Sequence, residues 1–108
     1  MIISLNKDNK NDIEELINNN NNVIILYYSL TCYYCNILKP TWNKLCENLK
    51  NKKGVIIINI ESENIKHIKE KYKKDVEGYP TIVKYSKGKK IKEYNGKREL
   101  EDLKNFIK

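Results

Sequence analysis

The hydrophobic residues of this chain follow two alternating spacings. Short runs of apolar residues, many of them β-branched or aromatic, predict five strands, and stretches in which apolar residues recur every three or four positions predict four helices. The runs that predict strands are residues 1–5, 23–28, 55–60, 81–85 and 90–94. The helical stretches are residues 8–17, 32–53, 65–72 and 100–107, and the five successive asparagines at 18–22 predict a loop.

The order of these elements, β-α-β-α-β-α-β-β-α, predicts an α/β fold with a mixed sheet. The run Val23–Tyr28 contains no polar residue other than its two tyrosines, which is typical of a central strand covered on both faces. Residues 86–89 connect the last two strand-like runs and predict an antiparallel hairpin at one edge. The 108 residues, without a long linker, have the length of a single domain, residues 1–108.

Composition adds a basic but evenly spread charge. The formal net charge is +7, and all but one of the 21 basic residues are lysines scattered over every segment. A nucleic-acid-binding surface would gather such residues with aromatic ones, so we expect neither a nucleic-acid nor a membrane partner. We also expect the protein to be a monomer. No apolar run approaches the roughly 20 residues that cross a bilayer, and the first residues lack the pattern of a secretory signal. We therefore expect an intracellular location.

The candidate chemistry lies in Cys32-Tyr33-Tyr34-Cys35, directly after the predicted central strand and at the start of a helix. Free N–H groups at a helix start carry partial positive charge, so they stabilise a thiolate and lower its pKa, and Lys39 adds a nearby charge. With two residues between the cysteines, the second thiol can resolve a mixed disulfide formed at the first. We predict that Cys32 is the nucleophile and that Cys35 is the buried, resolving thiol.

Around this turn the chain resembles the thioredoxin superfamily, and the resemblance covers nearly all of the sequence. The further matching features are Pro40, Asn59-Ile60-Glu61 and Gly78-Tyr79-Pro80-Thr81. The resemblance implies a thioredoxin fold, a central mixed five-stranded sheet flanked by four helices. It also implies that Pro80 follows a cis peptide bond and faces the cysteine pair.

The segment from Tyr94 to Ile107 is most similar to a catalytic domain of protein disulfide isomerases. This resemblance implies that Arg98, the only arginine, approaches the resolving cysteine and assists its deprotonation. It implies a thiol–disulfide oxidoreductase whose substrates are protein or peptide disulfides and whose electrons come from a thiol reductant or reductase. The residues expected to bind substrate lie beside the cysteines and the proline: Thr31, Tyr33, Tyr34, Tyr79 and Pro80.

Three positions depart from the pattern of the family. Leu26 stands where thioredoxins have a buried Asp and disulfide isomerases a Glu that relays protons to the resolving thiol. Thr31 replaces the usual Trp before the first cysteine, and Tyr33-Tyr34 replaces Gly-Pro or Gly-His between the cysteines. The missing acid and Trp favour an alternative function, a peptide-binding or chaperone module with weak or no catalysis. The two cysteines and Arg98 favour the enzyme.

Metal binding is the other common use of a Cys-x-x-Cys pair. Zinc needs four ligands, and only Cys46 and His67 could complete such a set. Cys46 lies on the apolar stripe of its helix and is expected in the core, whereas His67 lies in a lysine-rich segment and is expected at the surface. An iron–sulfur cluster held through Cys32, as in some glutaredoxins, is a further alternative. We predict neither a metal nor a cofactor.

Overall fold

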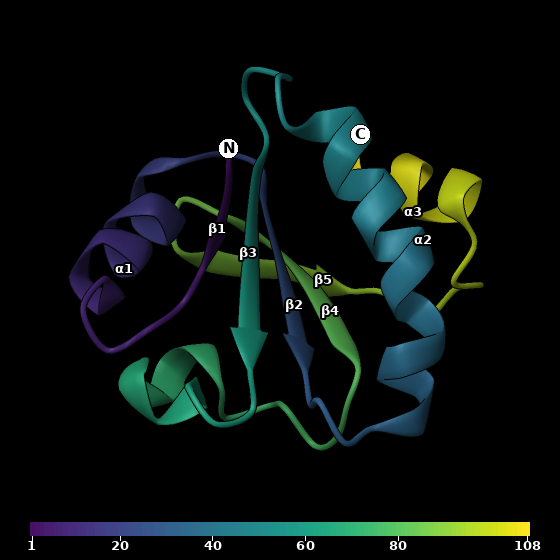
Figure 1. Ribbon diagram of the computed structural model, residues 1–108. Helices are drawn as coiled ribbons and strands as arrows, with labels where there is room; N and C mark the ends of the chain where they lie inside the picture. The colour runs from purple at the N-terminus through teal and green to yellow at the C-terminus, as the bar shows by residue number, and fades with distance from the viewer.

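The computed structural model describes all 108 residues as a five-stranded sheet with helices on both faces (Figure 1). The strands are β1 (Ile2–Ser4), β2 (Val23–Tyr28), β3 (Ile56–Glu61), β4 (Thr81–Ser86) and β5 (Lys89–Glu93). Their order in the sheet is β1-β3-β2-β4-β5, with β1, β3 and β2 parallel and with β4 and β5 joined to them antiparallel. The predicted mixed sheet, its central strand and its terminal hairpin are confirmed.

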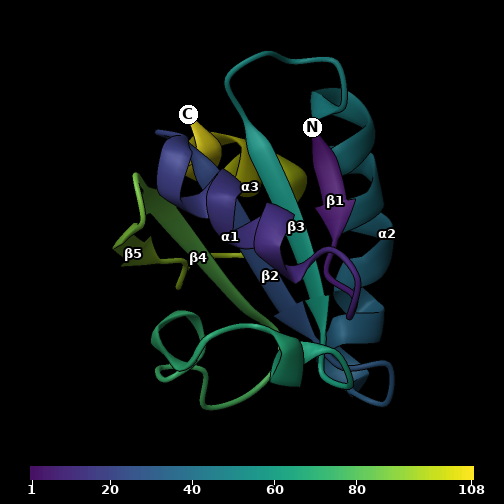
Figure 2. The same ribbon diagram turned by 90° about the vertical axis from the view of Figure 1, so that its left-hand side faces the viewer.

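Three helices cover the sheet: α1 (Lys10–Asn19), α2 (Tyr33–Leu49) and α3 (Leu100–Ile107). In Figure 2, α1 lies in front of the sheet and α2 and α3 lie behind it. The helix α1 extends further than predicted, because the first two of the five successive asparagines belong to it. The helix α2 continues through Pro40 and ends at Leu49, earlier than predicted. None of the helices combines the length and hydropathy that crossing a bilayer requires.

The fourth predicted helix does not form. Residues 65–72 instead make two short 3-10 turns, Ile65–His67 and Glu70–Tyr72. Ile68 between them has an extended backbone, with φ −99° and ψ 152°, and its side chain is only 3% exposed. Burying Ile68 against the sheet therefore interrupts the helical hydrogen bonds that the spacing of apolar residues predicts.

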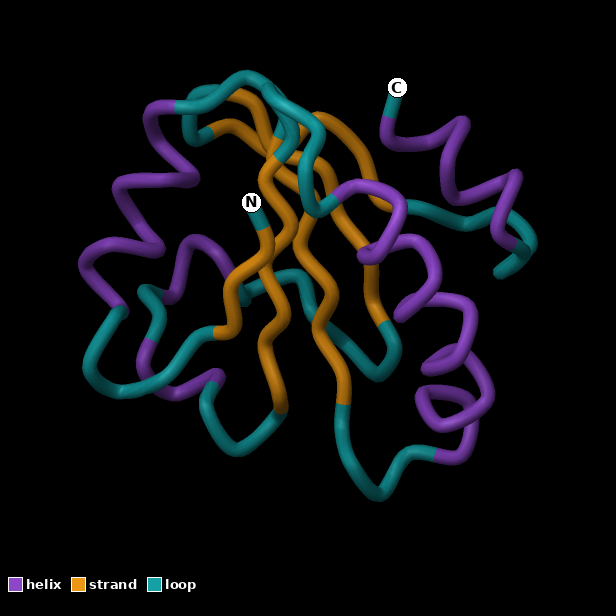
Figure 3. The backbone as a smooth tube through the Cα atoms, turned by 45° about the horizontal axis from the view of Figure 1, so that its top comes forward, coloured by secondary structure: helices purple, strands orange, loops and turns teal.

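The sheet separates two cores, which explains why its central strand is apolar at every position. On one face, Ile25 and Tyr27 pack with α1 and the 3-10 turns. On the other face, Ile24 and Leu26 pack with α2 and α3. Figure 3 shows the strands enclosed by helical segments on both sides, with loops at the ends of the strands. Because alternate residues of β2 point to opposite cores, the strand holds the loop that follows it in a fixed position.

Candidate active site

Two loops meet where β2 ends and β4 begins. Tyr27 near the end of β2 pairs with Thr81 at the start of β4, because these neighbouring strands are antiparallel. The loop after β2 leads to Cys32, the N-cap residue of α2, and the loop before β4 contains the cis Tyr79–Pro80 peptide bond. The sheet therefore brings the cysteine pair and Pro80 together, although they lie far apart in the sequence.

Cys32 forms hydrogen bonds with the first turn of α2 and with the loop before β4. Its Sγ atom accepts a hydrogen bond from the backbone N–H of Cys35 at 3.3 Å. As a thiol, it donates to the backbone carbonyl of Tyr79 at 3.4 Å. Burial acts to raise the pKa of the Cys32 thiol, but hydrogen bonds from Cys35 and from the Tyr34 backbone, together with the Arg98 charge, outweigh it, so the pKa lies below the ordinary value. Cys32 therefore has the properties of a nucleophile.

Cys35 lies in the first turn of α2 and is only 6% exposed. Burial and the hydrogen bond to Cys32 together raise the pKa of its thiol to about 11, against the opposing effects of the Ser29 backbone and Arg98. A neutral thiol beside a stabilised thiolate is the arrangement that a resolving cysteine needs. The two cysteines are thus unequal in the way the sequence predicts.

A positive charge near the thiols comes from Arg98. Arg98 is exposed in the segment before α3, and its charge lowers the pKa of both Cys32 and Cys35. Lys39 is not among the main groups that shift the pKa of Cys32, so its contribution stays a prediction. Lys39 lies two turns along α2, and its side chain extends to a different part of the site.

The surface around Cys32 is apolar and exposed. Tyr33 and Tyr34 are 71% and 60% exposed, with their rings packed edge to face at 5.3 Å. Two residues that the sequence did not single out extend this surface, since Leu30 is 63% exposed and Ile37 is 57% exposed. The apolar collar is the name we give to these four exposed residues, Leu30, Tyr33, Tyr34 and Ile37. The signal in the sequence for Tyr33, Tyr34 and Ile37 is that they do not align with the buried stripe of α2, whereas Leu30 lies in the loop before this helix.

The other predicted substrate-binding residues differ in their exposure and in which of their groups face Cys32. Thr31 is exposed, and its hydroxyl shares a hydrogen bond of 3.1 Å with that of Ser29. The side chain of Tyr79 packs against the core on the α1 face, so only its backbone faces Cys32. Pro80 is half-buried. The site therefore presents the backbone carbonyl of Tyr79 to the thiol and has the exposed apolar collar on the residues that flank Cys32 in the sequence.

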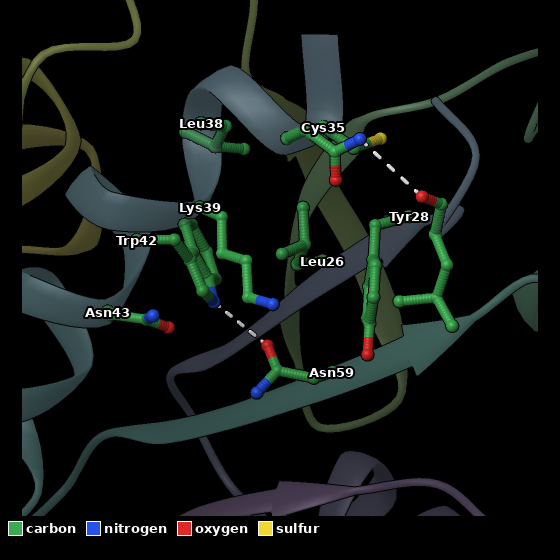
Figure 4. Close-up of a pocket in the computed structure, with 10 residues that line it drawn as sticks. Leu26, Tyr28, Cys35, Leu38, Lys39, Trp42, Asn43 and Asn59 are labelled. Atoms are coloured by element: carbon green, nitrogen blue, oxygen red, sulfur yellow. Dashed lines mark hydrogen bonds between the residues drawn. The ribbon is translucent and has the colours of Figure 1, made fainter. Parts of the chain in front are cut away.

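A cavity of about 120 Å³ lies behind Cys35 (Figure 4). Leu26, at the position of the missing acid, forms part of its wall and is 5% exposed. At the far side, the indole N–H of Trp42 donates to the side-chain oxygen of Asn59 at 2.9 Å. The ten residues that line the cavity are Leu26, Tyr28, Leu30, Cys35, Asn36, Leu38, Lys39, Trp42, Asn43 and Asn59. None of these residues carries a carboxylate.

Cys46 and His67 lie away from the cysteine pair. Cys46 packs against the core of the α2 face but is half-buried, less deeply than predicted, and burial raises the pKa of its thiol to about 11. His67 is half-buried in the first 3-10 turn, not fully at the surface. No cluster of three or more His, Cys, Asp or Glu side chains is placed to hold a metal ion.

Comparison with known proteins places this geometry in a family. Residues 3–108 match the family described as Thioredoxin. The chain belongs to the thioredoxin family. It is 36% identical over 107 residues to "Protein disulfide isomerase-like 2-2" of Oryza sativa subsp. japonica, covering 98% of this chain and 28% of that protein. This thioredoxin-family chain thus spans less than a third of the relative's length.

Solved structures agree on the fold of this thioredoxin-family domain. The crystal structure of the J-Trx1 fragment of ERdj5 superposes with a TM-score of 0.79 at 24% identity, covering 97% of this chain and 49% of that one. The first thioredoxin domain of mouse protein disulfide-isomerase A4 has a TM-score of 0.75 at 25% identity, covering 96% of this chain and 71% of that one. The domain carries both cysteines of its Cys-x-x-Cys pair at the start of α2.

Proposed function

We propose that this domain reduces or exchanges disulfide bonds in protein or peptide substrates, as a monomer, with electrons supplied by a thiol reductant or reductase. The observation that carries the proposal is the asymmetry of the two cysteines. Cys32 has a lowered pKa at the helix start, whereas Cys35 is buried with a pKa of about 11. The names of the relatives, which are protein disulfide isomerases, support the same reaction class.

The reaction balances with the two cysteines alone. The Cys32 thiolate attacks one sulfur of the substrate disulfide, and the other substrate sulfur leaves as a thiolate and takes up a proton. Cys35 then loses its proton, and its sulfur attacks Sγ of Cys32, which releases the second substrate thiol. Two electrons pass to the substrate and Cys32–Cys35 becomes a disulfide, which the external thiol reduces. In disulfide exchange, a thiol of the substrate itself, and not Cys35, attacks the mixed disulfide and displaces Cys32.

The surroundings of Cys32 fit an extended polypeptide. The backbone carbonyl of Tyr79 lies 3.4 Å from Sγ of Cys32, so a substrate segment that passes the thiol also meets exposed backbone. The apolar collar supplies apolar and aromatic contact where the family's Trp is absent, because Tyr33 and Tyr34 are largely exposed. The same collar supports the second candidate function, a module that binds unfolded chains without catalysis.

The test is reduction of an interchain protein disulfide by a small dithiol in the presence of the domain. We expect the wild type and Cys46→Ala to accelerate reduction, Cys32→Ser to be inactive, and Cys35→Ser to accumulate mixed disulfides that a non-reducing gel resolves. No acceleration above a variant that lacks all three cysteines would refute the enzyme. Binding of an unfolded chain by that cysteine-free variant would then establish the module in its place.

A further inference from the structure

The net positive charge of the chain is concentrated in the hairpin that β4 and β5 form. The basic hairpin, residues 84–92, contains five lysines and no acidic residue, so it holds +5 of the net charge of +7. In the rest of the chain, 16 basic residues are nearly balanced by 14 acidic ones. Of the five lysines, only Lys90 belongs to a salt bridge, with Asp75 at 3.6 Å and with Glu93 at 3.5 Å. The basic hairpin therefore lacks counter-charges for most of its lysines.

Two of these lysines repel each other across the hairpin. Lys84 and Lys92 lie directly opposite each other on β4 and β5, and their ammonium nitrogens are 5.5 Å and 5.6 Å from the centre of the Phe106 ring. Like charges at such positions are destabilising, and burial and the Lys92 charge lower the pKa of Lys84. Lys84 donates a hydrogen bond to the backbone carbonyl of Lys108 at 3.1 Å, but neither lysine meets a carboxylate. A negative charge beside this pair would offset the repulsion.

The strand β5 is a free edge of the sheet. It pairs with β4 on one side only, and all five of its residues are exposed. In Figure 2 it lies at the left-hand border of the molecule. The outer backbone N–H and C=O groups of an edge strand can pair with a further strand. Ile91 is 53% exposed, and apart from Met1 and the apolar collar it is the only large hydrophobic residue that is exposed. The edge thus offers hydrogen-bonding groups, positive charge and an apolar side chain.

Charge complementarity decides which strand this edge accepts. Lysines along an edge prevent it from pairing with a second copy of itself, because like charges would meet. The same lysines attract a strand that carries carboxylates. Nucleic acids and anionic lipids are also negative, but they do not supply the alternating donors and acceptors of a polypeptide backbone. The one aromatic residue of the basic hairpin, Tyr85, is buried and cannot stack on a base. An acidic, extended polypeptide fits the edge best.

The edge lies on the side of the molecule that holds the cysteine pair. Because β4 and β5 are antiparallel, Glu93 at the end of β5 pairs with Val83, two residues after the first residue of β4. The loop before β4 carries the backbone carbonyl that faces Cys32. The chain then continues from β5 to Arg98, whose charge lowers the pKa of both thiols. A polypeptide bound along β5 therefore extends toward the thiols at one of its ends.

We propose that β5 binds an acidic, extended segment of the protein substrate as a sixth strand of the sheet, while the disulfide of the same substrate reaches Cys32. The proposal rests on the proposed function for its catalytic consequence, although binding of the acidic segment does not depend on it. At about 3.4 Å per residue, a segment of about five residues covers β5. Main-chain hydrogen bonds supply affinity in this mode of recognition, and the side chains supply selectivity.

The first experiment measures binding by fluorescence anisotropy, with a variant that lacks all three cysteines. The probe is a labelled peptide of alternating glutamate and valine, longer than β5 and blocked at both ends. A peptide with proline in place of valine keeps the charge but cannot pair as a strand. The test variants are Lys89→Glu/Lys92→Glu and Lys89→Glu alone, since the Lys89 side chain forms no salt bridge or hydrogen bond that folding could require. Lys52→Glu/Lys53→Glu, in the exposed loop after α2, is the matched control for net charge.

We expect the glutamate–valine peptide to bind the parent and the loop control equally. Binding to Lys89→Glu/Lys92→Glu should be about 10-fold weaker, and to Lys89→Glu about threefold weaker, because attraction between exposed charges becomes repulsion. Amide hydrogen exchange in β5 should slow in the complex. Equal binding of the proline peptide would overturn the sixth strand, and equal binding by both test variants would overturn the basic hairpin. Tighter, lysine-dependent binding of single-stranded RNA or of phosphatidylserine vesicles would overturn the polypeptide.

A second measurement separates this proposal from the proposed function. Two disulfide-bonded peptides that differ only in a glutamate–valine extension serve as substrates of the wild type. We expect the extension to lower KM by about 10-fold at unchanged kcat, and Lys89→Glu/Lys92→Glu to remove most of this difference. If neither substrate is reduced while the peptide binds, the oxidoreductase function fails and the docking edge stands. If both are reduced with equal KM, the docking of substrates on β5 fails alone.

Discussion

Replacing Leu26 with Glu would place an ionisable group beside the resolving thiol. Leu26 is 5% exposed in the central strand and shares the wall of the cavity with Cys35. Because the thiol of Cys35 faces no carboxylate there, its proton has to pass to solvent or to a solute. The substitution therefore tests whether proton removal limits the second half of the reaction.

The magnitude follows from the pKa of the thiol. Burial raises the pKa of Cys35 from 9.0 to about 11. Each unit by which the pKa rises leaves about tenfold less thiolate at neutral pH. A Brønsted coefficient of about 0.4–0.5 makes the remaining thiolate about threefold more nucleophilic per unit, which offsets only part of this loss. Over the whole shift, the Cys35 thiol is about 10-fold slower at neutral pH than an unperturbed one.

We expect Leu26→Glu to accelerate resolution at neutral pH by about 10-fold or more, since the carboxylate takes the proton within the site. The wild-type rate should rise about tenfold per pH unit until the pH approaches the Cys35 pKa of about 11. The variant should show a flatter profile. Its stability against urea should fall by about 1–3 kcal/mol, the cost of a buried polar group without a partner.

The assay mixes an excess of protein with a chromogenic aromatic disulfide, so that attack by Cys32 releases one coloured thiol and attack by Cys35 releases the second in a slower phase. The rate of this slow phase is recorded as a function of pH. Leu26→Gln is the matched control, because it has the size and polarity of Glu but accepts no proton at neutral pH. Acceleration by Leu26→Gln equal to that by Leu26→Glu would attribute the effect to loosened packing. A wild-type rate that does not change between neutrality and the ordinary thiol pKa of 9.0 would refute the reasoning.

Three further predictions concern individual side chains. At neutral pH, iodoacetamide should modify Cys32 well before Cys35, whose pKa is raised to about 11, as peptide mapping would show; the reverse order would exchange their roles. Cys46 should react in the folded protein far more slowly than Cys32 and at an ordinary rate after denaturation, because burial raises its pKa to about 11, and rapid native labelling would contradict this. Arg98→Ala should move the alkylation profile of Cys32 to higher pH and slow resolution, because the Arg98 charge lowers the pKa of both thiols. The control Lys97→Ala should change neither the alkylation profile nor the rate of resolution.

The sequence alone determined those features that depend on local spacing. The apolar runs of β2 and β3 predict buried parallel strands because only residues covered on both faces lack an alternating pattern. The position of Cys32 between a strand and a helix predicts a thiolate at a helix start, since both elements are encoded by neighbouring residues. The order of the elements then restricts the topology to very few arrangements.

Tertiary structure decided what depends on residues distant in the sequence. The spacing of Ile65, Ile68 and Tyr72 predicts a helix, but the demand for a buried Ile68 produces two 3-10 turns instead. Lys39 is near Cys32 in the sequence and Arg98 is far from it, yet the Arg98 charge reaches both thiols, because folding sets the distances between charges. The cavity behind Cys35 also appears only in three dimensions, because β2, β3 and α2 must pack before Leu26, Asn59 and Lys39 share one wall.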